Sequence, residues 1–325
     1  MATLKDVAKL AEVSVTTVSR VINNRGYIST DTYNKVHDAM KVLNYQPDEI
    51  ARSLLKKQTN LIGLIVPSIT HPFFSVVIEE IEKNAAKKGY KLLLINSNNR
   101  TEATVDAMNM LKANKTAGIV LCNRTLDFDK YVDSSFPIIS LERENVKDSI
   151  VIACDNFRGG ELAANLLISK GCKHLVHISG SYGIKLPANQ REEGFSSVCE
   201  ENNVNYHIIR TTEEQFLEKN YIQQINEVFK KHPKVDGIFA SSDIIGMQVI
   251  QYCHSNKIDV PGKLKVVGFD NINESEYIYP RLTTIEQPIA TMCEHAINLI
   301  SKSNEGEIVA KNTLFPVNLI ERQST

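Results

Sequence analysis

From Leu61 onwards, short apolar runs of strand-forming residues alternate with stretches that have the spacing of amphipathic helices. Runs this apolar suit strands covered on both faces, and their alternation with helices predicts βαβ units around parallel sheets. The expected strands are 61–66, 91–95, 117–121, 137–141, 174–179, 206–210, 237–240 and 264–269, and the expected helices are 75–89, 102–114, 158–170, 190–202 and 243–257. Because this span is long for one open sheet, we expect two α/β lobes with a ligand-binding cleft between them.

Residues 3–44 have a different pattern, typical of three short helices around one small core. Thr3 with Asp6 resembles a capping box, and Ser14 and Ser29 are suited to cap the second and third helices. The apolar positions at helical spacing are Val7, Ala8, Ala11, Val18, Val21, Ile22, Tyr33, Val36, Met40 and Leu43. This spacing predicts one inward-facing stripe on each helix.

The first 58 residues are basic, whereas the rest of the chain is acidic. They hold nine Lys+Arg and six Asp+Glu, a net charge of +3, although the whole chain carries −1. A small basic head on a larger acidic body fits a nucleic-acid-binding arm. Pro47 ends the three-helix module, and residues 48–57 read as a linker helix that needs a partner to become ordered.

The first two helices and the tight turn at Glu12-Val13 have the proportions of a helix-turn-helix motif. In that motif the second helix enters the major groove of DNA. Its side chains that point away from the core are Val15, Thr16, Ser19 and Arg20. An arginine can donate two hydrogen bonds to guanine, and the methyl groups of valine and threonine can contact a thymine methyl. Spacing alone leaves open whether this is a DNA reader or an ordinary helical hairpin.

The segments TLKDVAKLAEVSVTTVSRVIN and KVHDAMKVLNYQPDEIARSL resemble the DNA-binding head and hinge of the LacI/GalR (lactose-repressor) family. The resemblance continues more weakly through LIGLIVPS, the DNxxGG stretch at 155–160, GFDN at 268–271 and PRLTTIEQP at 280–288, and the pattern is closest to ribose- or sucrose-operon repressors. It implies a small all-α helix-turn-helix head plus an α/β body of two parallel-sheet lobes, as in periplasmic binding proteins. The implied domains are 1–46 for DNA binding, 47–59 for a hinge helix and linker, and 60–325 for effector binding and dimerisation.

The resemblance assigns roles to residues of the head and hinge. Val15, Thr16 and Arg20 match positions that read bases. The residues that match phosphate contacts, which fix register without carrying sequence information, are Thr3, Ser14, Thr17, Ser19 and Asn23. Ala51 and Leu54 match hinge residues that enter the minor groove, where the leucine wedges between base steps and kinks the duplex. A single head offers too few contacts for a gene-specific site, so we expect a homodimer on a near-palindromic operator in double-stranded DNA.

The body resembles sugar-binding proteins, and SITHPFFSVVIEEIEKNAAKKGYKLLL is particularly similar to the start of ribose-binding proteins. Phe73 and Phe74 match aromatic residues that stack on a sugar ring, because the C–H faces of a sugar pack on aromatic faces. The polar residues that the resemblance places in the site are Glu142, Arg143, Arg191, Ser242, Asp243, Asp270 and Gln287. Phe216 is a candidate for a second aromatic wall.

Two of these positions depart from the family pattern. Glu142 stands where ribose-binding proteins have Asp, so its carboxylate reaches one carbon further. Ser242 stands where the family often has Asn, and its shorter side chain leaves room for a ligand or a water. The number of hydroxyl partners favours a monosaccharide or small furanose-containing sugar over a purine, with ribose first and a sucrose- or fructose-type ligand second.

The resulting prediction is a sequence-specific transcriptional repressor of a sugar-utilisation operon, controlled allosterically by a small sugar. Ligand can act on DNA binding only if it binds two lobe arrangements unequally. The sequence leaves open induction or corepression, and sugar pathways favour induction.

The sequence leaves one alternative function open and disfavours two others. A catabolite-control regulator that responds to a phosphorylated carrier protein would share this head and body. An enzyme is disfavoured because the sequence contains no G-x-x-x-x-G-K-[ST], G-x-G-x-x-G, H-E-x-x-H or G-x-S-x-G motif. A periplasmic carrier is disfavoured by the head and by the charged N-terminal sequence, which lacks a secretory signal.

The sequence also indicates the cellular compartment and the absence of cofactors. Six cysteines lie far apart without a C-x-x-C pair, which favours buried thiols in a reducing compartment. No stretch approaches the ~18 apolar residues of a membrane span. We expect a cytoplasmic protein with no cofactor, no metal site and no membrane partner.

Overall fold

The computed structural model describes residues 2–23, 25–46, 58–123, 136–143, 149–180 and 186–325. Two compact units make up the chain, a head (Met1–Thr59) and a body (Asn60–Thr325). The predicted hinge residues Ala51 and Leu54 lie outside the described residues. None of the described helices combines the length and the hydropathy that a membrane span requires.

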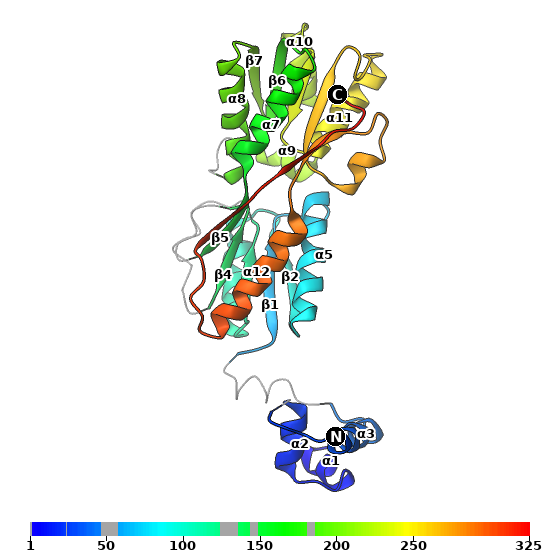
Figure 1. The fold of residues 1–325 in the computed structure, drawn as a ribbon, viewed down its shortest axis with the longest axis vertical. Helices are drawn as coiled ribbons and strands as arrows, with labels where there is room; N and C mark the ends of the chain where they lie inside the picture. Colours follow the sequence, from blue (N-terminus) through cyan, green and yellow to red (C-terminus); the bar gives the residue numbers. More distant parts are fainter. Residues whose placement is uncertain (1, 24, 47–57, 124–135, 144–148, 181–185) are drawn as a thin grey trace. The chain divides into compact units, whose positions relative to one another are not determined.

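The head consists of three short helices, as predicted (Figure 1). They are α1 (Leu4–Leu10), α2 (Val15–Ile22) and α3 (Thr30–Val42). Thr3 forms the predicted capping box with Asp6, and the hydroxyls of Ser14 and Ser29 accept hydrogen bonds from backbone N–H groups in the first turns of α2 and α3. Such caps are each worth about 1 kcal/mol, which matters for helices this short.

Most of the predicted inward positions of the head are buried in one cluster. Its buried members are Val7, Ala8, Ala11, Val18, Val21, Val36 and Ala39. The prediction was wrong for Tyr33, which is 44% exposed. Its ring lies against His37, 4.2 Å away between centroids, and Ala39 takes part in the core instead.

The body contains two six-stranded sheets, which confirms the predicted pair of parallel-sheet lobes. The first lobe has the order β11-β5-β4-β3-β1-β2, and the second has β12-β10-β9-β8-β6-β7. In the first sheet the strands are β1 (Leu61–Val66), β2 (Lys91–Asn96), β3 (Gly118–Leu121), β4 (Ile138–Leu141), β5 (Ile150–Cys154) and β11 (Asn312–Phe315). In the second they are β6 (His174–Ser179), β7 (Asn205–Arg210), β8 (Gly237–Ala240), β9 (Lys265–Asp270), β10 (Thr283–Glu286) and β12 (Asn318–Ile320). The edge strand β12 pairs antiparallel with β10, whereas the other pairings are parallel.

Helices cover both faces of each sheet. The first lobe has α5 (Pro72–Lys87) and α12 (Ile289–Asn304) packed on each other, and α6 (Thr101–Ala113) contributes to a separate cluster. The second lobe has α7 (Asn156–Ser169) and α8 (Gln190–Glu201) on one face, and α10 (Ile222–Lys231) and α11 (Asp243–Ser255) bury their apolar sides in another cluster. The short helix α9 (Glu213–Glu218) follows β7.

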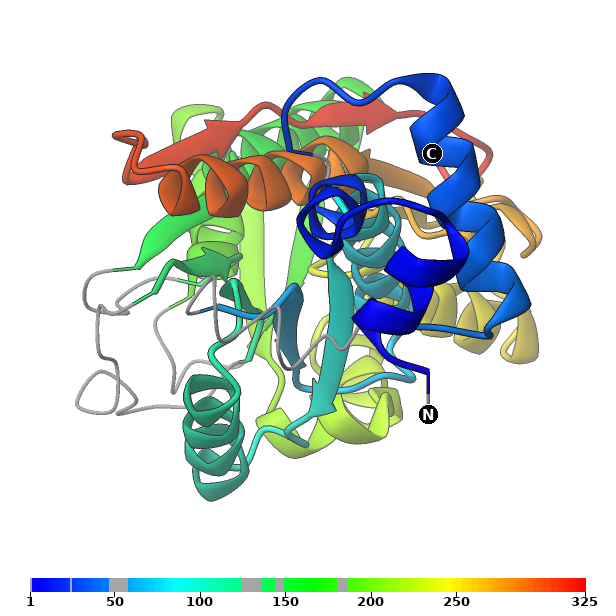
Figure 2. The same cartoon turned by 90° about the horizontal axis from the view of Figure 1, so that it is seen from below.

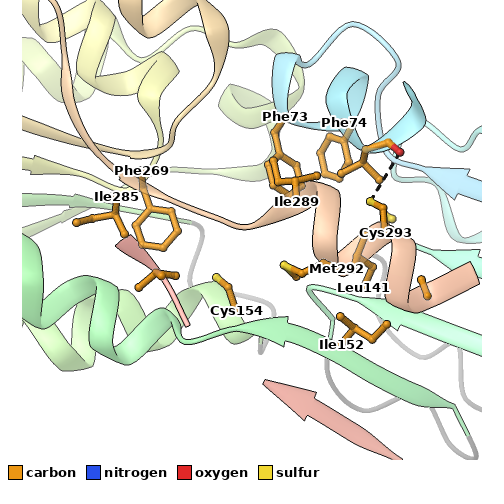
Figure 3. Close-up of a cluster of buried hydrophobic side chains, with 14 of the residues drawn as sticks. Phe73, Phe74, Leu141, Ile152, Cys154, Phe269, Ile285, Ile289, Met292 and Cys293 are labelled. Atoms are coloured by element: carbon orange, nitrogen blue, oxygen red, sulfur yellow. Dashed lines mark hydrogen bonds between the residues drawn. The ribbon is translucent and has the colours of Figure 1, made fainter. Parts of the chain in front are cut away.

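The chain passes between the lobes three times, after β5, after β10 and after β11. The last passage carries the C-terminal segment into the second lobe, where β12 pairs with β10 and contacts α7 (Figures 1 and 2). Phe269 of β9 is paired with Ile285 of β10, and Phe73 and Phe74 belong to the same large apolar cluster as these two residues (Figure 3). A continuous core therefore runs from one lobe to the other around these passages.

Candidate functional site

The start of α2 presents the residues predicted to contact DNA. Val15 is 41% exposed, and Thr16 and Arg20 are also exposed. The Ser14 hydroxyl accepts from the Thr17 N–H at 3.0 Å, and the two hydroxyl oxygens are 2.8 Å apart. Capping thus fixes the first turn of α2 while the side chains after the cap point outwards.

The remaining predicted contacts of the head lie in local hydrogen bonds. The Arg20 Nε donates to the Arg25 carbonyl at 3.3 Å, and a Cβ at Gly26 would lie 2.5 Å from the Arg20 guanidinium. Gly26, with φ +73°, therefore leaves the space that Arg20 occupies. Asn23 Nδ2 donates to the carbonyl oxygen of Ser19 at 2.7 Å. In α1, the Thr3 hydroxyl lies 2.7 Å from the Asp6 carboxylate, which confirms its role as a cap.

The body contains a cavity of roughly 860 Å³ of atom-free space, part of it open to solvent, between its two lobes. Both lobes contribute to its walls. The residues that line it are His71, Phe73, Phe74, Cys122, Glu142, Gly180, Leu186, Ala188, Asn189, Arg191, Thr211, Phe216, Tyr221, Ser241, Ser242, Ile245, Asp270 and Gln287. Seven of the nine predicted ligand-binding residues are therefore brought together here, and so is Phe216.

One wall of the cavity is aromatic. Phe73 and Phe74, in the first turn of α5, meet edge to face with ring centroids 5.0 Å apart. Phe216 of α9 stacks on His71 with centroids 5.0 Å apart and meets Phe74 edge to face at 6.2 Å. Because α5 belongs to the first lobe and α9 to the second, this wall spans both lobes.

Two hydrogen bonds join the lobes close to the aromatic wall. The Lys219 Nζ donates to the Thr70 hydroxyl at 2.9 Å, and the Asn99 amide donates to the Glu213 carboxylate at 2.9 Å. Both polar pairs bracket α9. A change in the distance between the lobes would have to break or re-form them.

Another part of the cavity lining is charged, and Arg191 is the cation in it. Its Nε donates to the Asn156 side-chain oxygen at 2.7 Å, and its Nη1 donates to the Ser241 carbonyl at 2.7 Å. The guanidinium lies over the Phe269 ring, 3.5 Å from the centroid, which is a favourable cation–π geometry. The same Nη1 is 3.8 Å from an Asp270 carboxylate oxygen. Arg191 is thus buried, held in place and paired with an acid.

Glu142 is the first of two carboxylates beside Arg191. Its two oxygens accept from the Cys154 N–H at 2.5 Å and from the Asn156 amide at 3.0 Å. Burial raises the pKa of Glu142, and the Arg191 charge and these hydrogen bonds offset part of that rise. Each carboxylate oxygen can accept a second hydrogen bond, so Glu142 keeps capacity for a ligand hydroxyl.

Asp270 is the second carboxylate, at the end of β9. Its Oδ1 accepts from the Gln287 amide at 2.6 Å. Burial raises the pKa of Asp270 to about 7, a rise that Arg191 and the Gln287 hydrogen bond oppose and the Glu142 charge reinforces. The Gln287 side-chain oxygen is buried and has no hydrogen-bond partner among the described residues. Acceptors and donors for hydroxyl groups therefore meet at one end of the cavity.

Arg143 and Asp243 are buried outside this lining. The Arg143 Nη1 donates to the Asn123 carbonyl at 2.9 Å. Asp243 accepts from the Thr284 hydroxyl at 2.5 Å and from the Ile272 N–H at 2.9 Å. Burial, reinforced by the Asp270 charge, raises the pKa of Asp243. Asp243 is not among the residues that line the cavity, and its two carboxylate oxygens accept from β10 and from the segment that follows β9.

Asn156 is a site residue that the sequence did not single out. It lies in the DNxxGG motif and bonds both Glu142 and Arg191, so it links the two charges. Gly160 of the same motif lets α7 approach α8, since a Cβ there would lie 2.1 Å from the Arg191 carbonyl oxygen. In the sequence this motif served only as part of the family resemblance. The polar residue at its second position was the signal that could have identified Asn156.

Neither a metal site nor disulfide bonds were predicted for this chain. The described part of the chain contains no group of three or more His, Cys, Asp or Glu side chains that could hold a metal ion. The six cysteines are buried and free.

Comparison with known protein families gives two matches. Residues 3–48 match the model of bacterial regulatory proteins of the lacI family. Residues 164–325 match the model of a periplasmic binding protein-like domain.

Among curated proteins, the chain is 38% identical to a sucrose operon repressor from Streptococcus mutans, over 100% of this chain and 99% of that protein. It is 35% identical to a ribose operon repressor from Halalkalibacterium halodurans, over 100% and 97% respectively.

Among solved structures, a periplasmic binding protein/LacI transcriptional regulator from Alkaliphilus metalliredigens in complex with D-xylulofuranose is 31% identical, with a TM-score of 0.74 over 82% of this chain and 99% of that one. The Lac repressor bound to ONPG in its repressed state is 25% identical, with a TM-score of 0.85 over 100% of this chain and 99% of that one.

Proposed function

This chain belongs to the lacI family of bacterial regulatory proteins, and from that premise we propose that it represses transcription of a sugar-utilisation operon. The observation that carries the proposal is the cavity between the lobes, where a buried guanidinium and two carboxylates face an aromatic wall. The similar curated proteins are themselves named operon repressors, so the proposed role is regulatory and not catalytic.

The head supplies the DNA contact. Val15, Thr16 and Arg20 are exposed on the N-terminal turns of α2, which suits base-edge contacts in the major groove. Phosphate contacts are proposed for five further residues of the head, which are Thr3 (the N-cap of α1), Ser14, Thr17, Ser19 and Asn23. To contact a base edge, Arg20 must release its hydrogen bond to the Arg25 carbonyl, which is a weak bond at 3.3 Å. Two heads of a homodimer would read a near-palindromic operator.

The cavity is proposed to bind a small sugar. Phe73, Phe74 and Phe216 offer faces for the C–H groups of the ring. Arg191 donates, whereas Glu142 and Asp270 accept, so together they suit vicinal hydroxyls. Gln287 and Ser242 add polar groups at the passage between lobes and at the start of α11. Arg143 stays a predicted ligand contact, and Asp243 is assigned to support of the chain that follows Asp270.

A furanose is the favoured ring. The structure that is 31% identical was solved with D-xylulofuranose, and two similar repressors are named for sucrose and ribose operons. We therefore propose D-ribose first and a fructose- or sucrose-type ligand second.

The regulatory mechanism follows from linkage. A sugar that contacts both lobes binds one lobe arrangement better than another and shifts the population towards it. Because the polar pairs around α9 join the lobes directly, the two arrangements differ in defined contacts. The affinity for operator then changes by the same coupling free energy as the affinity for sugar. We propose induction, in which bound sugar lowers operator affinity.

A thermal-shift screen tests the ligand class. Full-length protein is heated with D-ribose, D-fructose, D-xylulose, sucrose and their phosphate esters, since a ligand that prefers the native state raises Tm. We expect an unphosphorylated sugar to give the largest shift and to change operator affinity. A response only to a phosphorylated carrier protein would replace this proposal with catabolite control.

A further inference from the structure

The chain that leaves β9 has an unusual backbone. Asp270 has φ +114° and Asn271 has φ +57°, and neither is a glycine. Residues other than glycine are destabilised at positive φ, so such a turn persists only where contacts with its surroundings stabilise it. Asp270 is also the carboxylate that faces Arg191 and Gln287 in the cavity. Whatever holds this turn therefore decides where that carboxylate points.

Arg322, near the C-terminus, holds the turn from outside the cavity. Its Nη2 donates to the Asn271 side-chain oxygen at 2.7 Å and to Glu276 at 2.7 Å. Its Nη1 donates to the Leu282 carbonyl at 2.8 Å and to the Ser275 hydroxyl at 3.3 Å. One guanidinium thus ties both ends of the connection between β9 and β10, and its side chain is only 10% exposed.

The C-terminal segment that carries Arg322 is itself fixed to β9 and β10. The Arg322 N–H donates to the Thr283 hydroxyl at 2.9 Å. The Ser324 hydroxyl donates to the Val266 carbonyl at 2.6 Å, and the Val266 N–H donates to the Ser324 carbonyl at 2.9 Å. The backbone that carries Arg322 is therefore already fixed by other hydrogen bonds. The four hydrogen bonds of the guanidinium act mainly to restrain the connection between β9 and β10, and are not needed to hold the C-terminal segment in place.

The turn is also held from within the second lobe. Asp243 accepts from the Ile272 N–H, and the Asn271 N–H and side-chain amide donate to Thr284 and Glu286 at 3.4 and 3.0 Å. These bonds fix the residues around Asn271 but leave its side-chain oxygen to Arg322. Loss of Arg322 would thus loosen the turn without removing all of its support.

We infer that Arg322 is a positioning residue for ligand recognition, which aims the Asp270 carboxylate into the cavity by holding Asn271. The inference rests on the proposed sugar-binding function. A lysine would not replace this arginine, because one ammonium cannot form the planar fork that reaches Asn271 and Leu282 at once.

The test compares the full-length wild type with R322Q, R322K and N271G. N271G removes the acceptor, tolerates the positive φ and leaves the C-terminal segment intact. E321Q is the matched control, since Glu321 is the neighbouring residue and pairs with Lys170 at a more exposed position. Ligand-free crystal structures of these variants are combined with calorimetric titrations of D-ribose, D-fructose and sucrose, and with the double variant R322Q/N271G.

We expect R322Q, R322K and N271G each to weaken sugar binding by about tenfold or more, with E321Q unchanged. R322Q should lower Tm both in the wild type and in N271G. In N271G it should not reduce sugar affinity further, because the hydrogen bond between Arg322 and Asn271 is already lost. A purely structural role would give the same loss in both backgrounds and would overturn the inference.

The crystal structures decide the inference even without a sugar. We expect R322Q to lose the positive φ of Asp270 or its hydrogen bond from Gln287. If R322Q keeps both, Arg322 does not position Asp270. If none of the three sugars binds the wild type, the proposed ligand class fails while this structural comparison still judges Arg322.

Discussion

The head and the body build their candidate sites in opposite ways. In the head, Val15, Thr16 and Arg20 lie within two turns of one helix, and all three are exposed. In the body, the site joins segments from His71 to Gln287, and two of its charged members, Arg191 and Asp270, are buried. The first site depends on one capped helix, whereas the second depends on two lobes and the passages between them.

Because one site lies on a single exposed helix and the other is assembled from distant segments, the two sites should tolerate different substitutions. Substitution of an exposed residue on α2 removes one contact and leaves the helix formed. Substitution of a buried charge leaves its partner unpaired, which costs far more than the lost hydrogen bond. If the two sites are built as described, their variants should separate DNA binding from sugar binding.

The largest effect is expected for D270A. Loss of this carboxylate removes a proposed acceptor for the sugar hydroxyls and leaves the Gln287 amide without its partner, so sugar affinity should fall roughly 100-fold, on the order of 3 kcal/mol. Operator affinity without sugar should match that of the wild type. Calorimetry and fluorescence anisotropy measure the two quantities, and E193Q, an exposed change in α8, is the control. Unchanged sugar affinity would count against the assignment.

R20A should produce the largest effect in the head. A bidentate contact to guanine is worth about 1–3 kcal/mol, so specific operator affinity should fall roughly tenfold to hundredfold. Affinity for unrelated duplexes should fall much less, and sugar binding should not change. K35A, which removes the i,i+4 ion pair with Asp31 on α3, is the matched control. Equal losses on all duplexes would reassign Arg20 to phosphate contact.

L54A tests the predicted hinge. If Leu54 wedges between base steps, its loss should weaken operator binding by roughly tenfold, because the unstacked and kinked duplex of the complex loses its support. Nonspecific binding should change less. The assay compares both duplexes at one fixed salt concentration, since phosphate contacts make affinity depend on salt. Equal losses on both would contradict the wedge.

The smallest effect is a dependence on pH that only the body should show. Because burial raises the pKa of Asp270 to about 7, this carboxyl releases its proton between pH 6 and 8. If the carboxylate accepts from sugar hydroxyls, affinity should rise by about tenfold from pH 6 to pH 8. Calorimetry across this range measures it, and a flat profile would contradict the role of the charged form.

The same group affects folding with the opposite sign. Its pKa in the folded state lies above the unfolded value of about 4. Its contribution to stability is present below that unfolded pKa and is lost as the pH rises through about 7. D270N should remove this loss in denaturant titrations.

The sequence predicted most of the fold because its signals were local. Strand 61–66 and the cap at Ser14 match the structure, since apolar runs and capping side chains act over a few residues. The prediction missed β5, because this strand begins only nine residues after β4 ends, closer than the alternation of strands and helices led us to expect. It also missed β12, a three-residue edge strand with little apolar pattern.

The site was predicted unevenly, for a physical reason. The resemblance indicated Arg191 and Asp270, which do meet in the cavity. Asn156 and Arg322 act through other side chains across 35 and 51 residues of sequence, and no local pattern reports such a contact. The resemblance predicted Asp243 as a ligand contact at the start of a helix, but its carboxylate accepts from Ile272 and Thr284.

A sugar bound between the lobes is proposed to change the affinity of the heads for operator DNA. The most direct test is the operator affinity of full-length protein, on a duplex selected from random sequence, with and without the sugar that raises Tm. We expect the sugar to weaken operator binding by the wild type and to leave operator binding by D270A unaffected. A sugar that binds the wild type without changing its operator affinity, or that changes D270A equally, would contradict it.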